Sequence, residues 1–329
     1  MHKAIKSIPG IKPVLRAYHQ LLTYKVRGEF PANMSLHNYG TIAPQDLWIL
    51  QFIENKHLLK DKPQATISMF SVFGLKTMMR LDNSDIKLFF ARENVHRVNW
   101  KKYDDMCLNM SCIDLSIGFD IREEIKYLRF PLWIMWIFSP SVTYSDLKEF
   151  TERVNNPQNS SYDNRRFCSF VGSHDDIGRF ELVNEIASIE KVDCDGKLFH
   201  NNDDLKRKFA DNKLEYLRNY RFNLCPENSD YPGYCTEKIF EAISSGCLPI
   251  YCGSCNNPEP DILNREAICF VKLGEPNHNA VNQITALNGS SMKYLEFAHQ
   301  PRLTKESPDI IFEYIRKLET NLTTIIKNV

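Results

Sequence analysis

Residues 220–253 read YRFNLCPENSDYPGYCTEKIFEAISSGCLPIYCG and contain the pattern that decides the fold. The apolar run Phe222–Cys225 predicts a buried strand, and Glu237–Ser245, closed by Gly246, has the apolar spacing of a helix. A second apolar run, Leu248–Cys252, follows directly. A strand, a helix and a further strand in this order form the repeating unit of a parallel sheet. This stretch therefore predicts an α/β domain.

The turn and the helix start in this stretch have the chemistry of an anion site. Thr236 is a suitable N-cap residue. The N–H groups at the start of a helix attract phosphate, and Lys238 adds a full positive charge in the same turn. Asn228, Tyr234 and Glu237 offer groups for the sugar, the ribose or the base of a ligand. On spacing alone, an ordinary solvated helix start is the alternative interpretation.

Both halves of the chain alternate between apolar runs and helical patterns. In the second half the predicted strands are Phe167–Val171 and Ala267–Val271, and the predicted helices are Arg179–Glu190, Leu205–Asn219 and Pro308–Lys327. In the first half the predicted strands are Leu47–Ile53, Ala65–Phe73, Ile86–Ala91 and Ile113–Phe119. The polar stretch Thr151–Asn164 predicts a linker. We expect two domains, residues 1–152 and 153–329, with a C-terminal helix that is able to pack back on the first.

Composition narrows the classes of partner and the location of the protein. Lys and Arg together number 41, and so do Asp and Glu; this balance argues against a nucleic-acid partner, which requires a basic surplus. The basic N-terminus lacks the apolar core of a signal peptide, and ten irregularly spaced cysteines suit a reducing compartment. We expect a cytoplasmic protein. Residues 14–26 place apolar side chains at helical spacing among basic ones, and they either pack on the first domain or associate peripherally with an anionic membrane surface.

The opening stretch resembles the signature of the α1,3/4-fucosyltransferases, glycosyltransferase family 10. The matching motifs are, in chain order, Tyr220-Arg-Phe, Glu227-Asn-Ser, Tyr234-Cys-Thr-Glu-Lys and Pro249-Ile-Tyr-Cys-Gly. Pro226 and Cys235 depart from the family's usual residues without removing a ligand group. The resemblance implies a GT-B fold, with two facing Rossmann-like domains and a cleft between them. It also implies inverting transfer of L-fucose from GDP-fucose to a hydroxyl of a glycan acceptor, such as GlcNAc of a Gal-GlcNAc unit through an α1,3 or α1,4 linkage.

The resemblance also assigns roles to residues in the donor-binding half. It implies that Glu237 contacts the fucose or the ribose, that Lys238 contacts the diphosphate, and that Asn228 and Tyr234 complete the donor pocket. Arg179 falls where the family has a second diphosphate-binding residue, and a planar guanidinium can bind two phosphate oxygens at once. Because two cations can neutralise the diphosphate, no metal cofactor is required, although stimulation by a divalent metal stays open.

An inverting transfer also needs a carboxylate that takes the proton from the acceptor hydroxyl. Glu93 follows the predicted strand Ile86–Ala91, where ligands bind in α/β sheets. The surrounding stretch resembles the family's acceptor domain through Arg92-Glu-Asn, Asp114-Leu-Ser-Ile-Gly-Phe-Asp and Tyr127-Leu-Arg-Phe-Pro, with Arg92 in place of the family's glycine. Glu93 is therefore the predicted catalytic base. Asp120 is the weaker catalytic alternative.

Three other functions remain open from the sequence. The first is a GT-B enzyme with a different nucleotide-sugar donor. The second is a non-catalytic nucleotide- or glycan-binding protein, which would have no need of Glu93 beside Arg179 and Lys238. The third is a metal-dependent GT-A enzyme, for which Asp193-Cys-Asp195 has the spacing of the required Asp-x-Asp motif.

Overall fold

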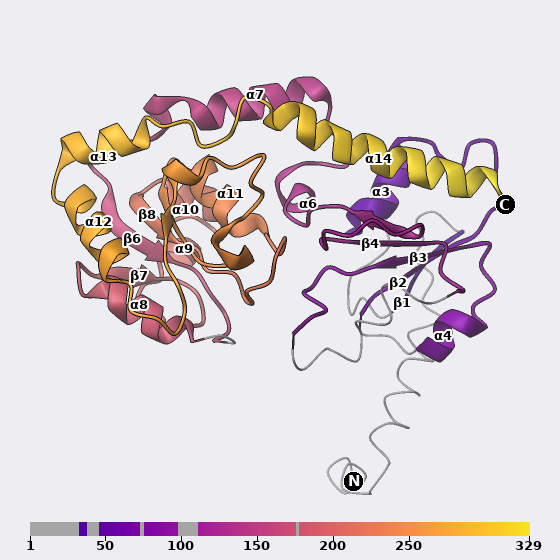
Figure 1. The fold of residues 1–329 in the computed structure, drawn as a ribbon, viewed down its shortest axis with the longest axis horizontal. Coiled ribbons are helices and arrows are strands. Elements are labelled where there is room, and N and C mark those ends of the chain that lie inside the picture. The colour runs from indigo at the N-terminus through magenta and orange to yellow at the C-terminus, as the bar shows by residue number, and fades with distance from the viewer. Residues whose placement is uncertain (1–32, 38–45, 73–75, 98–110, 176–177) are drawn as a thin grey trace, which may run out of the picture. The chain divides into compact units, whose positions relative to one another are not determined.

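A computed structural model describes the chain except for residues 1–32, 38–45, 73–75, 98–110 and 176–177 (Figure 1). The described residues belong to two compact units. The first unit contains the chain up to Phe130 together with residues 139–141 and 315–329. The second unit contains residues 131–138 and 142–314. The chain therefore passes from the first unit to the second after Phe130, whereas the predicted domain boundary is at residue 152.

The predicted linker Thr151–Asn164 begins inside a helix. Helix α7 runs over Tyr144–Asn155, and Thr143 and Asp146 form a capping box at its start. Its buried side consists of Leu147, Phe150, Thr151 and Val154. The turn-forming residues at the end of α7 resemble a linker, but the cap and the apolar stripe before them are what determine the structure.

The first unit contains a parallel sheet whose strands are neighbours in the order of the sequence. The order is β1-β2-β3-β4-β5, and the strands are Met34–His37, Ile67–Phe70, Ile86–Phe90, Leu115–Gly118 and Tyr127–Arg129. Helix α3 (Trp48–Asn55) connects β1 to β2, and helix α4 (Lys76–Leu81) connects β2 to β3. Every residue of β2 and β4 is buried, as expected for parallel strands that are covered on both faces.

Three of the four strands predicted in the first half are confirmed as β2, β3 and β4, and the fourth prediction is wrong. The run Leu47–Ile53 lies almost wholly in helix α3, where the buried residues are Trp48, Ile49, Leu50, Phe52 and Ile53. A short apolar run that is buried on most sides fits a strand or a helix equally well. Hydrophobic periodicity alone cannot separate the two.

The second unit contains a parallel sheet with the order β10-β9-β8-β6-β7. Its strands are Arg166–Phe170 (β6), Val192–Cys194 (β7), Tyr220–Leu224 (β8), Leu248–Tyr251 (β9) and Cys269–Phe270 (β10). Counted from β6, this is the 2-1-3-4-5 order of a doubly wound fold, in which the strand order reverses between β6 and β8. Ligands of such folds bind outside the carboxyl ends of the strands at this reversal.

Helices pack on this sheet through one hydrophobic cluster. Apolar side chains of α8 (Arg179–Ala187), α12 (His278–Asn288) and α13 (Ser291–Ala298) join those of the strands in it. Helix α11 (Glu237–Ser244) places Phe240 against Trp133, with ring centroids 3.8 Å apart. These contacts set the position of α8 and α11, the two helices that begin near the reversal of strand order.

The predicted helix Leu205–Asn219 is two short helices, α9 (Asp204–Arg207) and α10 (Lys213–Leu217). Between them Ala210 and Asp211 have φ values of 49° and 64°. This left-handed backbone is incompatible with a continuous right-handed helix. The signal for a new helix start is Asn212, the N-cap of α10, whose side chain accepts a hydrogen bond from the Glu215 N–H at 3.2 Å.

Helix α14 (Ser307–Lys327) begins in the second unit and belongs to the first unit from Ile315 onward. In the first unit its Leu318, Leu322 and Ile326 are buried. Glu319 forms an ion pair with Lys56, next to α3, at 3.0 Å. The C-terminal helix thus supplies part of the hydrophobic core of the first unit.

No helix in the described part of the chain combines the length and apolar character needed to cross a membrane. The predicted membrane-docking segment, residues 14–26, lies outside the described residues. Peripheral association with a membrane and a cytoplasmic location therefore stay predictions from the sequence.

Gly246 provides a test of how closely α11 is held within its unit. Its φ is 74°, and a Cβ atom there would lie 1.9 Å from the carbonyl oxygen of Asn159. We expect Gly246→Ala to lower the free energy of unfolding by about 3 kcal/mol, because it combines a left-handed backbone penalty with a clash. Urea denaturation measures this. Gly274→Ala is the matched control, since φ is 71° and nothing lies within 4 Å; equal losses would contradict the clash.

Candidate functional site

A small recess lies at the carboxyl ends of β6 and β8, where the strand order of the second unit reverses. Three cationic side chains line it: Arg179, Lys213 and Lys238. The remaining lining residues come from the two strand ends: Phe170, Val171, Asn223, Leu224, Cys225 and Pro226. The structure therefore brings together the two residues predicted to bind a diphosphate. It adds Lys213, which the sequence analysis did not single out.

Arg179 is the first residue of α8 and is held by both strand ends. Its side chain is buried, and its guanidinium donates to the carbonyl oxygens of His174 at 2.9 Å and Pro226 at 3.3 Å. Its backbone N–H donates to the Asp175 carboxylate at 2.6 Å. Gly178 precedes the helix with a φ of 83° and allows the chain to turn into it. The guanidinium is thus fixed in the recess before any ligand binds.

Lys238 lies in the first turn of α11 within a group of oxygen acceptors. Its ammonium donates to Thr236 Oγ1 at 2.6 Å, Glu227 Oε2 at 3.0 Å and Glu237 Oε1 at 3.3 Å. Burial by itself would lower the pKa of Lys238, but the charges of Glu227 and Glu237 outweigh it and raise the pKa above its ordinary value. Lys238 is therefore cationic throughout the physiological pH range.

Glu227 is a second residue of this site, besides Lys213, that reasoning from the sequence did not single out. Its side chain is 0% exposed and accepts hydrogen bonds from the Thr236 N–H at 2.7 Å, the Thr236 hydroxyl at 2.6 Å and Lys238 at 3.0 Å. The Tyr251 hydroxyl donates to it at 3.4 Å. A charged acceptor shortly after a buried strand, in Glu227-Asn-Ser, is the signal that could have identified it. A buried carboxylate must be paired, and here its partner is the predicted phosphate ligand Lys238.

The start of α11 differs from the prediction in how it is capped. Thr236 occupies the N-cap position, but its side chain makes no cap hydrogen bond. Its hydroxyl donates to Glu227, so the carboxylate of Glu227 organises the helix start. Gly253 makes room for this carboxylate, because a Cβ atom there would lie 2.6 Å from Glu227 Cγ. The predicted C′ glycine, Gly246, is confirmed by its positive φ.

The other predicted donor-site residues differ in how far they are accessible. Glu237 is 25% exposed, and although burial opposes its ionisation, Lys238 and Lys213 keep its pKa below the ordinary value. Asn228 is half-buried and accepts a hydrogen bond from Ser229 at 3.4 Å. Tyr234 is only 2% exposed. Glu237 and Asn228 can therefore offer polar groups to a ligand, whereas Tyr234 presents little surface.

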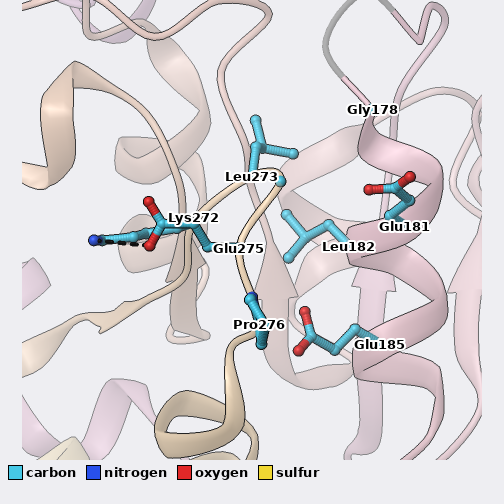
Figure 2. A pocket seen from close by; sticks show the side chains of 9 residues that line it. Gly178, Glu181, Leu182, Glu185, Lys272, Leu273, Glu275 and Pro276 are labelled. Carbon is cyan, nitrogen blue, oxygen red and sulfur yellow. Dashed lines mark hydrogen bonds and ion pairs between the residues drawn. The ribbon is translucent and has the colours of Figure 1, made fainter.

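A larger cavity, of about 320 Å³, lies beside α8 (Figure 2). Glu181 and Glu185 project from the helix, and the segment 272–276 forms the opposite wall. Among the described residues that line it, the one cation is Lys272, which is paired with Glu275 at 3.1 Å. An excess of carboxylates repels an anion, so the smaller cationic recess is the better candidate for a diphosphate despite its size.

The predicted base lies in the first unit. Glu93 follows β3 in a loop, where it is half-buried and one carboxylate oxygen is buried. Asp120, the alternative base, follows the neighbouring strand β4 and contacts His96 Nε2 at 2.6 Å. Its backbone N–H donates to the Tyr127 hydroxyl at 2.8 Å. Asp120 thus ties two loops together.

The acidic pair considered for a GT-A enzyme is engaged in the structure. Asp193 lies in β7 and forms ion pairs with Arg166 at 2.8 Å and Lys191 at 2.9 Å. Asp195 accepts a hydrogen bond from the backbone N–H of Leu205 at 3.1 Å. Asp193 therefore holds the edge strand of the sheet through its ion pairs.

Glu227→Gln tests the buried carboxylate. We expect it to lower the free energy of unfolding by about 3 kcal/mol, since a buried ion pair loses one partner. Glu215→Gln is the control, because Glu215 pairs with Arg218 at 2.7 Å on the surface, where a pair contributes at most about 1 kcal/mol. Chemical denaturation of both variants gives the comparison. A loss for Glu227→Gln no larger than that of the control would show that Glu227 is not a structural anchor.

Two family models match successive parts of the chain. The alpha-(1,3)-fucosyltransferase FucT N-terminal domain matches residues 36–136, and the glycosyltransferase family 10 (fucosyltransferase) C-terminal domain matches residues 164–305. The chain is 31% identical to alpha-(1,3)-fucosyltransferase FucT of Helicobacter pylori over 228 residues, 56% of this chain and 47% of that protein. It is 25% identical to alpha-(1,3)-fucosyltransferase B of Drosophila melanogaster over 193 residues, 56% of this chain and 43% of that protein. The chain thus spans about half the length of the curated relatives it matches.

Solved structures match over a larger share of the chain. A crystal structure of an alpha1,3-fucosyltransferase is 22% identical, with a TM-score of 0.59 and coverage of 89% of both chains. A crystal structure of an alpha1,3-fucosyltransferase with GDP-fucose has the same identity and coverage and a TM-score of 0.58. With its two parallel-sheet units and both family models matched in succession, the chain belongs to glycosyltransferase family 10, the fucosyltransferases, and has their GT-B fold.

Proposed function

We propose that this chain is an inverting glycosyltransferase that transfers L-fucose from GDP-fucose to a hydroxyl of a glycan acceptor. The observation that carries the proposal is the recess at the reversal of strand order, which Arg179 and Lys238 line together. Membership of family 10 supports GDP-fucose as the donor. The names of the Helicobacter and Drosophila relatives support an α1,3 linkage. GlcNAc of a Gal-GlcNAc unit is the proposed acceptor.

The two cations suit the leaving group of this reaction. When the bond between the fucose anomeric carbon and the β-phosphate breaks, negative charge grows on the diphosphate. Arg179 is held rigidly and can present its planar guanidinium to two oxygens, while Lys238 supplies a second charge. A cation that is already in place, as Arg179 is, stabilises this charge without reorganisation. The same charges allow the departure of GDP without a metal cofactor, and stimulation by a divalent metal remains part of the proposal to be measured.

Glu237 and Asn228 are the groups proposed for the sugar or ribose hydroxyls. Glu237 is ionised and 25% exposed, so its carboxylate can accept hydrogen bonds from hydroxyls. Asn228 can both donate and accept. Tyr234, buried to 2% exposure, supports the walls of the pocket more than it contacts the ligand.

Glu93 is the proposed base. Its carboxylate takes the proton from the acceptor hydroxyl as that oxygen attacks the anomeric carbon from the face opposite the diphosphate, which inverts the configuration. Asp120 suits this role less, because His96 already contacts its carboxylate at 2.6 Å.

Protection against heat unfolding distinguishes the proposed donor from its alternatives. GDP and GDP-fucose should raise the melting temperature by mass action, and UDP-sugars should not. Protection by UDP-sugars alone would overturn the donor assignment. Incubation with GDP-fucose and acceptors that end in GlcNAc or Gal, followed by linkage analysis of the product, then tests transfer itself. Binding of GDP without transfer to any acceptor would favour the non-catalytic alternative.

The role of Glu93 predicts a separation of catalysis from donor binding. We expect Glu93→Gln to lower turnover by a factor on the order of 10² or more, because the general base is lost. The affinity for GDP should stay the same, since Glu93 belongs to the first unit and the cationic recess to the second. Steady-state kinetics and GDP titration measure the two effects.

Glu123→Gln is the control for this variant, because Glu123 is an exposed acid of the same unit. Its turnover should equal that of the unmodified chain. Unchanged turnover in Glu93→Gln would remove Glu93 from the mechanism.

A further inference from the structure

The cationic recess contains one residue to which neither the sequence motif nor the family resemblance assigns a role. Lys213 lines it together with Arg179 and Lys238. It is the first residue of α10, and the left-handed Ala210 and Asp211 that separate α10 from α9 determine where this helix begins. The break in the chain is therefore what brings the lysine to the carboxyl end of β8.

Lys213 differs from Lys238 in its hydrogen bonds. The ammonium of Lys238 donates to Thr236, Glu227 and Glu237, which accounts for all three of its N–H groups. The ammonium of Lys213 donates to Glu241 Oε2 at 2.5 Å, and within the described residues it has no other hydrogen bond. Two of its N–H groups are thus available for a ligand oxygen, and the side chain is 26% exposed.

Lys213 interacts electrostatically with two carboxylates of α11, Glu241 and Glu237. Glu241, its partner, lies on α11 one turn after Glu237. Burial raises the pKa of Glu241, and the charge of Lys213 opposes that rise. Lys213 also acts with Lys238 to lower the pKa of Glu237. One ammonium thus influences both carboxylates on this side of α11.

We propose that Lys213 is a third diphosphate-binding cation of the donor site, with one of its three N–H groups paired to Glu241. The inference rests on the proposed function, because it takes the donor to be a nucleoside-diphosphate sugar. Lys213 binds a phosphate oxygen with its available N–H groups, so it binds without giving up an existing partner. Arg179 and Lys213 then provide the first contacts of the diphosphate, and Lys238 completes them.

The competing explanation is that Lys213 and Glu241 form an ion pair whose only task is to hold α10 against α11. The two explanations predict different changes in GDP affinity when either partner is removed. If the pair is purely structural, Lys213→Met and Glu241→Gln both break it and should change GDP affinity equally. If Lys213 binds phosphate, only Lys213→Met should weaken GDP binding. Glu241→Gln removes an anion that competes with the phosphate for Lys213.

Titration of the full chain with GDP, followed by calorimetry, tests the proposal. We expect Lys213→Met to weaken GDP binding by about tenfold or more, as for loss of a hydrogen bond to a charged group. Glu241→Gln should bind GDP as tightly as the unmodified chain or more tightly. Lys208→Met is the control, because Lys208 also pairs with a carboxylate, Asp204, at 3.0 Å but lies outside the recess; its GDP affinity should not change.

The double variant Lys213→Met/Glu241→Gln keeps the test decisive if Lys213→Met alone unfolds. It removes both charges, so the half-buried carboxylate of Glu241 is not left unpaired, and it should bind GDP as weakly as expected for Lys213→Met. An affinity for GDP within twofold of the unmodified chain in either lysine variant would overturn the proposal. So would an equal weakening by Glu241→Gln. A failure of the unmodified chain to bind GDP would instead overturn the proposed function on which this inference rests.

Discussion

The site in the second unit depends on one buried carboxylate. Glu227 lies three residues after the end of β8, is fully buried, and accepts hydrogen bonds from Thr236 and Lys238. A charge in this environment is tolerated only with its partners in place. The start of α11 and the ammonium of Lys238 are therefore located by the end of the strand. This is how a lysine, with its long flexible side chain, acquires a defined position beside Arg179.

The sequence predicted most of what surrounds this interaction. The alternation of apolar runs with helical spacing located β6, β8 and β9, which are buried strands of one sheet, and α11, which has a buried apolar side. Gly246 was recognisable at the end of the predicted helix, since only glycine readily adopts the left-handed backbone conformation that is needed there. Lys238 was singled out by its position at a predicted helix start, whereas Arg179 was singled out by the resemblance to the family. Apolar runs, helix starts and turn glycines depend on residues that are close together in the chain, so they can be predicted from the sequence.

What the sequence did not reveal depends on contacts between distant residues. Glu227 was legible as part of a motif, but its burial under Tyr251 and Gly253 exists only in the folded sheet. Lys213 lies within a charged segment that reads as one helix, and only the reversal of backbone conformation at Ala210 and Asp211 places it in the recess. Leu47–Ile53 was assigned to a strand because nearly uniform burial removes the periodicity that distinguishes helix from strand.

The hydrogen bonds of Lys238 limit how a phosphate oxygen of the proposed donor can reach its ammonium. An ammonium has three N–H groups, and all three donate to Thr236, Glu227 and Glu237. A phosphate oxygen can join only if one of these partners leaves. Glu227 is fully buried with three other donors around it, whereas Glu237 is 25% exposed and at 3.3 Å has the longest of the three contacts. Of the three partners, Glu237 is therefore the one that a phosphate oxygen would displace with the least loss, and its carboxylate would then be released for another partner.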